Sequence, residues 1–116
     1  MNLKEQLLNP VVSKPVSVQM FNREFLVKKM STARLMDIEK KMEQLGKGSS
    51  PEGVNHFTAE VILEAMVDED GASMTKDISP DELLELYDPK SISDALNAVY
   101  TANYVSAAGE EAAKKD

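Results

Sequence analysis

The segment Val61–Leu86, VILEAMVDEDGASMTKDISPDELLEL, constrains the fold more than any other part of the chain. Its first residues are apolar around most of a helix, and only Glu60 and Glu64 form a polar edge, so this helix should be central. An acidic turn follows. The sequence Ser79-Pro80-Asp81-Glu82 then has the spacing of a capping box, which begins a second helix. Such a segment packs against other elements and presents an acidic edge, which favours binding over catalysis.

Length and composition limit the class of protein. A chain of 116 residues is long enough for one domain with a buried core. It has no cysteine, which excludes disulfides, thiolate catalysis and cysteine-ligated metals. The start, MNLKEQLLNP, does not have the pattern of a signal peptide, and no apolar run approaches the roughly 18 residues of a membrane span. We therefore expect a cytoplasmic protein without a membrane partner.

Charge is distributed unevenly along the chain. Residues 1–50 contain nine Lys/Arg and five Asp/Glu, whereas residues 51–116 contain four Lys/Arg and fifteen Asp/Glu. The acidic excess argues against a nucleic-acid partner, whose phosphates require a basic surface. The opposite charges either pair within one molecule or join copies head to tail, which would build a ring or a filament.

The secondary structure can be predicted from periodicity and capping signals. Apolar and polar residues alternate over Val16–Met20 and again over Glu24–Lys29, which predicts a β-hairpin at about 16–29 with a turn at Asn22-Arg23. Apolar stripes at helical spacing predict the helices. These cover Leu3 to Leu8, about Ala33 to Leu45 after a cap at Ser31 or Thr32, Phe57 to Val67, the segment after Ser79, and the segment from Asp88-Pro89 to Gly109.

The predicted fold class is α+β, mainly α, with four to five helices and a small N-terminal β-hairpin. Residues 1–109 should form a single globular domain, with a flexible Gly/Ser-rich linker at about 46–55 and a polar tail at 110–116. The core should draw on the apolar residues of the helical stripes, namely Leu35, Ile38, Met42, Val61, Ile62, Met66, Leu83, Ile92, Leu96 and Val99.

Acidic residues after the central helix invite comparison with a calcium-binding loop. Asp68, Asp70 and Gly71 match the third, fifth and sixth positions of such a loop. The first position would then be Met66 and the last Asp77, so one ligand is missing and the bidentate glutamate is absent. The favoured interpretation is a turn in which Asp side chains accept local amide hydrogen bonds.

No pattern in the sequence indicates catalysis. His56 is the only histidine, and its neighbours supply no metal-binding or catalytic motif. No serine or threonine lies in a recognisable nucleophile motif, and no glycine-rich phosphate loop follows a predicted strand. We therefore expect no enzyme activity and no cofactor.

Methionine and tyrosine supply the candidates for contact with a partner. The chain has seven Met, whose flexible side chains adapt to varied surfaces, and Tyr100 and Tyr104 are four apart on one helix face. Both residue types also suit core packing, so both roles remain open. The candidate partner-binding residues are Met36, Met42, Met66, Tyr87, Tyr100 and Tyr104.

The order of elements resembles a known family. A short hairpin, a helix, an apolar helix that leads into V-D-E-D-G at Val67–Gly71, a Ser-capped helix and a last helix with Asn103 are similar to tail assembly chaperones of long-tailed (siphovirus-type) bacteriophages. The similarity covers most of the chain, although the linker at Gly46 departs from it. It implies a mainly helical phage or prophage protein of the host bacterial cytoplasm. Such a protein coats and solubilises the tape measure protein and helps recruit tail tube subunits during tail morphogenesis.

The resemblance also implies a longer, frameshifted product that recruits the tail tube protein. Ala113-Lys114-Lys115 can be encoded by a slippery heptamer, so Lys114 and Lys115 are the candidate joint; an ordinary polar tail is the alternative. Two further interpretations of function remain. The chain could be a structural head–tail connector or tail-completion subunit, or a small bacterial adaptor unrelated to phage.

Overall fold

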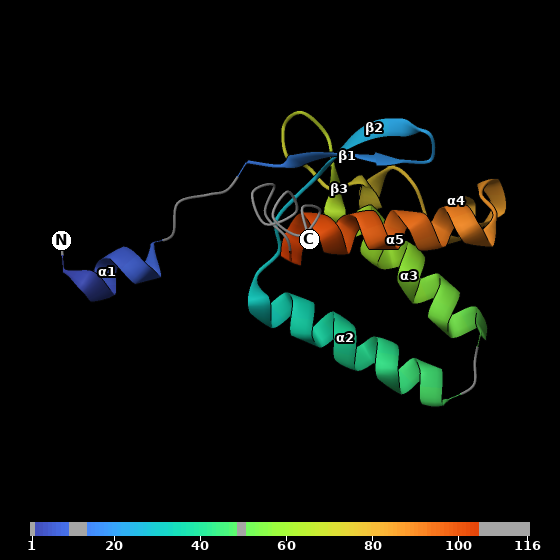
Figure 1. Ribbon diagram of the computed structural model, residues 1–116, viewed down its shortest axis with the longest axis horizontal. Helices are drawn as coiled ribbons and strands as arrows, with labels where there is room; N and C mark the ends of the chain where they lie inside the picture. The colour runs from blue at the N-terminus through green and yellow to red at the C-terminus, as the bar shows by residue number, and fades with distance from the viewer. Residues whose placement is uncertain (1, 10–13, 49–50, 105–116) are drawn as a thin grey trace, which may run out of the picture.

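The computed structural model describes residues 2–9, 14–48 and 51–104 (Figure 1). Five α-helices, three strands and one short 3-10 helix occur within these residues. In chain order they are α1 (Leu3–Leu8), β1 (Val16–Met20), β2 (Arg23–Val27), α2 (Thr32–Lys47), α3 (Pro51–Ala65), β3 (Met66–Val67), η1 (Met74–Lys76), α4 (Pro80–Leu86) and α5 (Pro89–Tyr104). The predicted class, α+β and mainly helical with an N-terminal hairpin, is confirmed.

The sheet has one strand more than the sequence predicted. Strand β3 pairs antiparallel with β2, with Leu26 opposite Val67 and Val27 opposite Met66, so the strand order is β1-β2-β3. The prediction that the central helix continues to Val67 was therefore wrong. Met66 and Val67 are both buried, and their backbone groups pair with β2. A strand of two residues is too short to produce a recognisable alternation of apolar and polar residues.

The hairpin turns at Phe21-Asn22 rather than at the predicted Asn22-Arg23. Both residues have positive φ, 55° and 62°, as a two-residue hairpin turn with the correct twist requires. This conformation is uncommon for a bulky residue such as Phe21. The Phe21 ring stacks on Tyr87 at 4.1 Å between centroids and meets the edge of Phe25 at 6.4 Å, so aromatic contacts hold the turn.

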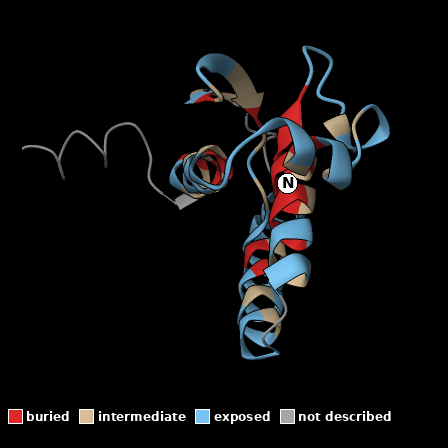
Figure 2. Cartoon of the chain, turned by 90° about the vertical axis from the view of Figure 1, so that its right-hand side faces the viewer, coloured by how far each residue is buried: buried red, intermediate tan, exposed pale blue. Residues whose placement is uncertain are grey.

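Helix α3 forms the centre of the core, as predicted. It contacts α2, α4 and α5, and its apolar residues from Phe57 to Ala65 are buried. Figure 2 shows the buried residues concentrated in the middle of the molecule, with exposed residues at its periphery. Of the predicted core residues, only Met42 and Leu96 are partly rather than fully buried, and both pack against buried clusters.

The connection between α2 and α3 is shorter than predicted. Helix α2 continues through Gly46 to Lys47, and α3 begins at Pro51, so the predicted linker at about 46–55 was wrong in extent. A glycine within a helix lowers helix stability by roughly 1 kcal/mol relative to alanine. The helix nevertheless continues past Gly46, because its backbone hydrogen bonds are kept. The Gly48 amide still donates to the Gln44 carbonyl at 3.1 Å, and proline suits the first position of α3.

Asn103 fixes the segment between β2 and α2 to the end of α5. Its Oδ1 accepts a hydrogen bond of 2.6 Å from the Met30 amide, and its Nδ2 donates to the Val99 carbonyl at 2.9 Å. The same Nδ2 lies 3.5 Å from the Lys28 carbonyl. One side chain therefore satisfies backbone groups of the sheet-to-helix connection that β2 leaves unpaired.

Candidate partner-binding surface

An apolar groove of about 370 Å³ lies between α3, α4 and α5. We call it the α3–α4–α5 groove and define its apolar walls as Leu84, Tyr87, Ile92 and Leu96. Thr58 of α3 also lines it, and its hydroxyl donates a 2.8 Å hydrogen bond to the Val54 carbonyl of the same helix. The polar group of Thr58 is thus satisfied, and the groove as a whole suits an apolar ligand.

Two helix caps lie at the starts of α4 and α5, two of the helices that form the groove. Ser79 and Glu82 form the predicted capping box at the start of α4, with both reciprocal hydrogen bonds present. The Asp88 carboxylate accepts a 2.8 Å hydrogen bond from the Ser91 amide at the start of α5. The Ser91 hydroxyl and then its amide lower the pKa of Asp88 by hydrogen bonding to the carboxylate. Tyr87 joins the two helices in an extended conformation, which places its ring beside the groove.

A larger, charged cleft of about 630 Å³ adjoins the groove and shares Asn55 and Leu84 with it. Its charged or titratable lining residues come from α2, α3 and α4, namely Lys41, Glu52, His56, Glu60 and Asp81. His56 Nδ1 lies 2.9 Å from the Glu60 carboxylate, and Nε2 lies 3.9 Å from Asp81. Carboxylates outnumber cations, so this cleft suits a basic side chain.

The outer edge of α4 is strongly acidic. Residues 77–88 contain five carboxylates and no Lys or Arg, and we call them the acidic rim: Asp77, Asp81, Glu82, Glu85 and Asp88. All five are exposed. Within the rim, Leu86 is 71% exposed and Tyr87 is 37% exposed. Exposed apolar side chains enclosed by charge are typical of a surface that contacts another protein.

Two of the predicted partner-binding residues come together in the structure. Met42 and Tyr100 pack against the same buried cluster, formed by Ile38, Phe57 and Val61. Burial, and then the negative charge of Glu39, raise the pKa of Tyr100 above that of a free tyrosine. These two residues are partly buried, so they combine core packing with a limited exposed surface.

The other candidates are dispersed. Tyr87 lines the α3–α4–α5 groove, and Met36 is 54% exposed on α2. Met66 is only 6% exposed in β3, where it packs in the core and presents no surface to a partner. The side chain of Tyr104 and the residues Lys114, Lys115 and Gly109 lie outside what the structure describes.

Sequence reasoning did not predict the groove itself. Ile92 and Leu96 were expected only in the core, and Leu84 was not singled out. The available signal was the close succession of two caps, at Ser79 and Asp88, which makes α4 too short to cover the side of α5.

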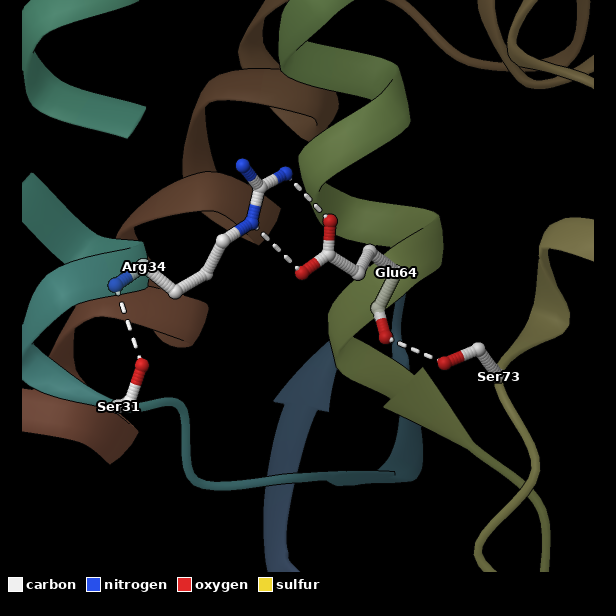
Figure 3. A network of polar contacts seen from close by, with 4 residues as sticks. All are labelled: Ser31, Arg34, Glu64 and Ser73. Carbon is white, nitrogen blue, oxygen red and sulfur yellow. Dashed lines mark hydrogen bonds and ion pairs between the residues drawn. The ribbon is translucent and has the colours of Figure 1, made fainter. Parts of the chain in front are cut away.

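An ion pair joins α2 to α3 away from the groove walls (Figure 3). The Arg34 guanidinium donates two hydrogen bonds to the Glu64 carboxylate, at 3.0 and 2.6 Å. Ser31 caps α2 by accepting from the Arg34 amide, and the Ser73 hydroxyl donates to the Glu64 carbonyl at 2.8 Å. The hydrogen bonds from Arg34 lower the pKa of Glu64, against the opposing effect of its partial burial.

The acidic turn after β3 has the predicted local structure. Asp68 Oδ1 accepts hydrogen bonds from the amides of Asp70 and Ala72, at 2.9 and 3.0 Å, and Gly71 has a φ of +87°. Across the part of the chain that the structure describes, no group of three or more His, Cys, Asp or Glu could hold a metal ion. Asp68 thus forms a turn with its own backbone.

Helix α1 carries three strongly exposed leucines. Its leucines Leu3, Leu7 and Leu8 are 73%, 74% and 69% exposed, and no residue of α1 is buried. Asn2 caps the helix by accepting a 2.8 Å hydrogen bond from the Glu5 amide. In Figure 1, α1 and α4 lie at opposite ends of the molecule.

Comparison with known proteins adds no family assignment. No protein-family model, curated protein or solved structure shows significant similarity to this chain. None of the helices within the described ranges is long and apolar enough to cross a membrane.

Proposed function

We propose that this protein is a tail assembly chaperone of a long-tailed bacteriophage or prophage, and that it binds an apolar helical segment of the tape measure protein. The observation that carries the proposal is the α3–α4–α5 groove beside the exposed residues Leu86 and Tyr87. A groove of this kind accepts the apolar face of an amphipathic helix, with anchors spaced three or four residues apart.

The charge around the groove specifies the partner segment further. The acidic rim and the carboxylates of the adjoining cleft, Glu52, Glu60 and Asp81, favour a helix with Lys or Arg beside its apolar face. Apolar contacts would supply most of the affinity, and charge would select the orientation and increase the association rate. The preferred ligand is therefore an amphipathic helix that is apolar on one face and basic along one flank.

Three features support the chaperone function rather than a generic binding role. The order of elements and the V-D-E-D-G turn resemble tail assembly chaperones, and the mainly helical fold agrees with that resemblance. A long apolar helical chain aggregates if its surface is left open, and a groove that covers it prevents this. We place this activity in the host bacterial cytoplasm, where a longer form extended beyond Lys114-Lys115 would recruit tail tube subunits.

Co-expression with the tape measure gene tests the proposal. The wild-type chain should raise the soluble yield of the tape measure protein severalfold, because its apolar helices are covered. Ser93, an exposed residue that lines the groove, provides the test variant: Ser93→Arg should abolish the effect by filling the groove. Thr101→Arg, two turns further along α5 and also exposed, should behave like wild type.

Two outcomes would contradict the proposal. An unchanged soluble yield with the wild-type chain would remove the chaperone role. Detection of this chain in stoichiometric amounts in purified tails would favour the connector or tail-completion subunit instead. The longer form is tested by the gene itself: AAG codons at both Lys114 and Lys115, or no open −1 frame beyond them, would exclude a frameshift at this site.

A further inference from the structure

We infer that α1 of one molecule places its leucines in the α3–α4–α5 groove of a second copy of this chain. The first observation is that α1 is a helix without a buried residue, although Leu3, Leu7 and Leu8 are each about 70% exposed. A six-residue helix is far below the roughly 12–15 residues that are marginally stable alone in water, so it needs a packing partner.

The surfaces of α1 and of the groove are complementary. Leu3 and Leu7 are four residues apart and therefore share one helix face, with Leu8 beside it. The groove offers aliphatic and aromatic walls of matching character, namely Leu84, Tyr87, Ile92 and Leu96. Lys4 lies between the leucines on the helical surface, so a docked α1 would bring its ammonium group close to the acidic rim.

The position of α1 in the fold favours a second copy over the same chain. The hairpin tip at Phe21 stacks on Tyr87, so the end of β1 lies near the groove and its start faces back toward α1. Figure 1 places α1 and α4 at opposite ends of the molecule. An intramolecular contact would require α1 to return along the whole of β1. A contact between two different surfaces of identical copies is heterologous and generates a ring or an open filament.

The contact should be weak and depend on protein concentration. A six-residue helix with three leucines buries much less than the roughly 1,600 Å² of a standard stable interface. Self-association should therefore appear only in concentrated protein. The inference does not depend on the proposed function, because it concerns the purified protein alone. Where both hold, a partner segment would displace α1 from the groove.

Sedimentation equilibrium of the purified full chain tests the role of α1. The weight-average mass of the wild type should rise with concentration, and salt should weaken the rise only in part because most of the contact is apolar. The double variant Leu3→Ser/Leu7→Ser should remain monomeric, whereas Glu5→Gln, on the face of α1 opposite Leu3 and Leu7, should associate like wild type. A wild-type monomer at every concentration, at low and at high salt, would overturn the inference, as would undiminished association of the double variant.

Disulfide cross-linking identifies the docking site. The chain has no cysteine, so introduced thiols are the only ones present. A mixture of Leu8→Cys and Ser93→Cys chains should form a mixed disulfide dimer, well above the yield from Leu8→Cys mixed with Thr101→Cys. One chain that carries both Leu8→Cys and Ser93→Cys should form a ladder of multimers. An intramolecular disulfide in a monomer, or equal yields with the two acceptor positions, would contradict the assignment.

The failure of this inference can be separated from the failure of the proposed function. The double variant Leu3→Ser/Leu7→Ser leaves the groove intact, so it should still raise the soluble yield of the tape measure protein. Loss of that yield in Ser93→Arg, with no self-association in the wild type, would overturn only the present inference. Self-association that depends on α1, without any effect on tape measure solubility, would overturn only the chaperone function.

Discussion

Helices α1 and α3 are both rich in aliphatic residues, yet those of α3 are buried and those of α1 are exposed. In α3, Val61, Ile62 and Leu63 are at most 1% exposed, because sheet and helices surround them. In α1, the leucines are among the most exposed apolar side chains of the described residues. Packing within one molecule therefore accounts for α3 and leaves α1 unexplained. The difference indicates that α3 belongs to the folded core, whereas the exposed leucines of α1 are a surface for contact with another molecule.

The largest expected effect comes from the buried side of this comparison. Ile62→Ala should lower the free energy of unfolding by roughly 2–5 kcal/mol, because it removes methyl groups from a closed core. Leu96→Ala should fall toward the lower end of the same range, since Leu96 is only partly buried. Urea titrations of wild type and both variants measure these losses. A loss below about 0.5 kcal/mol for Ile62→Ala would show that α3 is not the core helix.

Asn103 tests whether the folded domain depends on polar contacts, here between α5 and the β2–α2 connection, as well as on apolar packing. Asn103→Ala should cost roughly 1–3 kcal/mol, because the Met30 amide loses its partner in a partly buried site. Asn97→Ala, at an exposed position of the same helix, is the matched control and should change stability little. Equal unfolding midpoints for the two variants would mean that water replaces the amide at no cost.

The same contrast explains how much of the fold the sequence could predict. The caps at Ser79 and Asp88, the hairpin and most core residues depend on local patterns, and these were predicted correctly. The cap of α2 was narrowed to Ser31 or Thr32, and the structure places it at Ser31. Strand β3 depends on the edge of β2, which is distant in sequence, so its two residues were read as helix. Sequence patterns report local geometry and burial, but they do not report which distant segment completes a sheet.

Prediction of the site was weaker for a related reason. Methionine and tyrosine were chosen by residue type, and the structure buries Met66 and places Tyr87 beside a groove. The groove arises from the ends of three helices, and no single segment contains its pattern. The sequence predicted α1 as a short helix, but it did not show that the leucines of this helix would stay exposed, because that depends on which other elements pack against it.

An intermediate effect is expected at the ion pair between α2 and α3. Glu64→Gln should lower stability at neutral pH by roughly 1 kcal/mol, since the pair with Arg34 is partly solvated. The pKa of Glu64 is lowered in the folded state, so its contribution is fully present above the unfolded value of about 4.3. It should disappear as the pH falls through the lowered folded value.

Stability measured across an acid titration checks both the size and the sign. The difference between wild type and Glu64→Gln should shrink as Glu64 becomes protonated. Glu43→Gln, which removes an exposed pair with Lys47, provides the control and should matter much less at any pH. A difference for Glu64→Gln that grows below pH 4 would contradict the pKa shift.

The smallest effect on folding should come from α1, and it completes the comparison. Leu7→Ser should change the free energy of unfolding in dilute protein by less than about 0.5 kcal/mol, because the side chain is 74% exposed. In concentrated protein the two chains should differ. Docking of α1 on a second copy stabilises only the folded state, so the wild-type unfolding midpoint should rise with concentration while that of Leu7→Ser stays constant. If the unfolding midpoints of wild type and Leu7→Ser are equal at every concentration, α1 contributes to neither folding nor association.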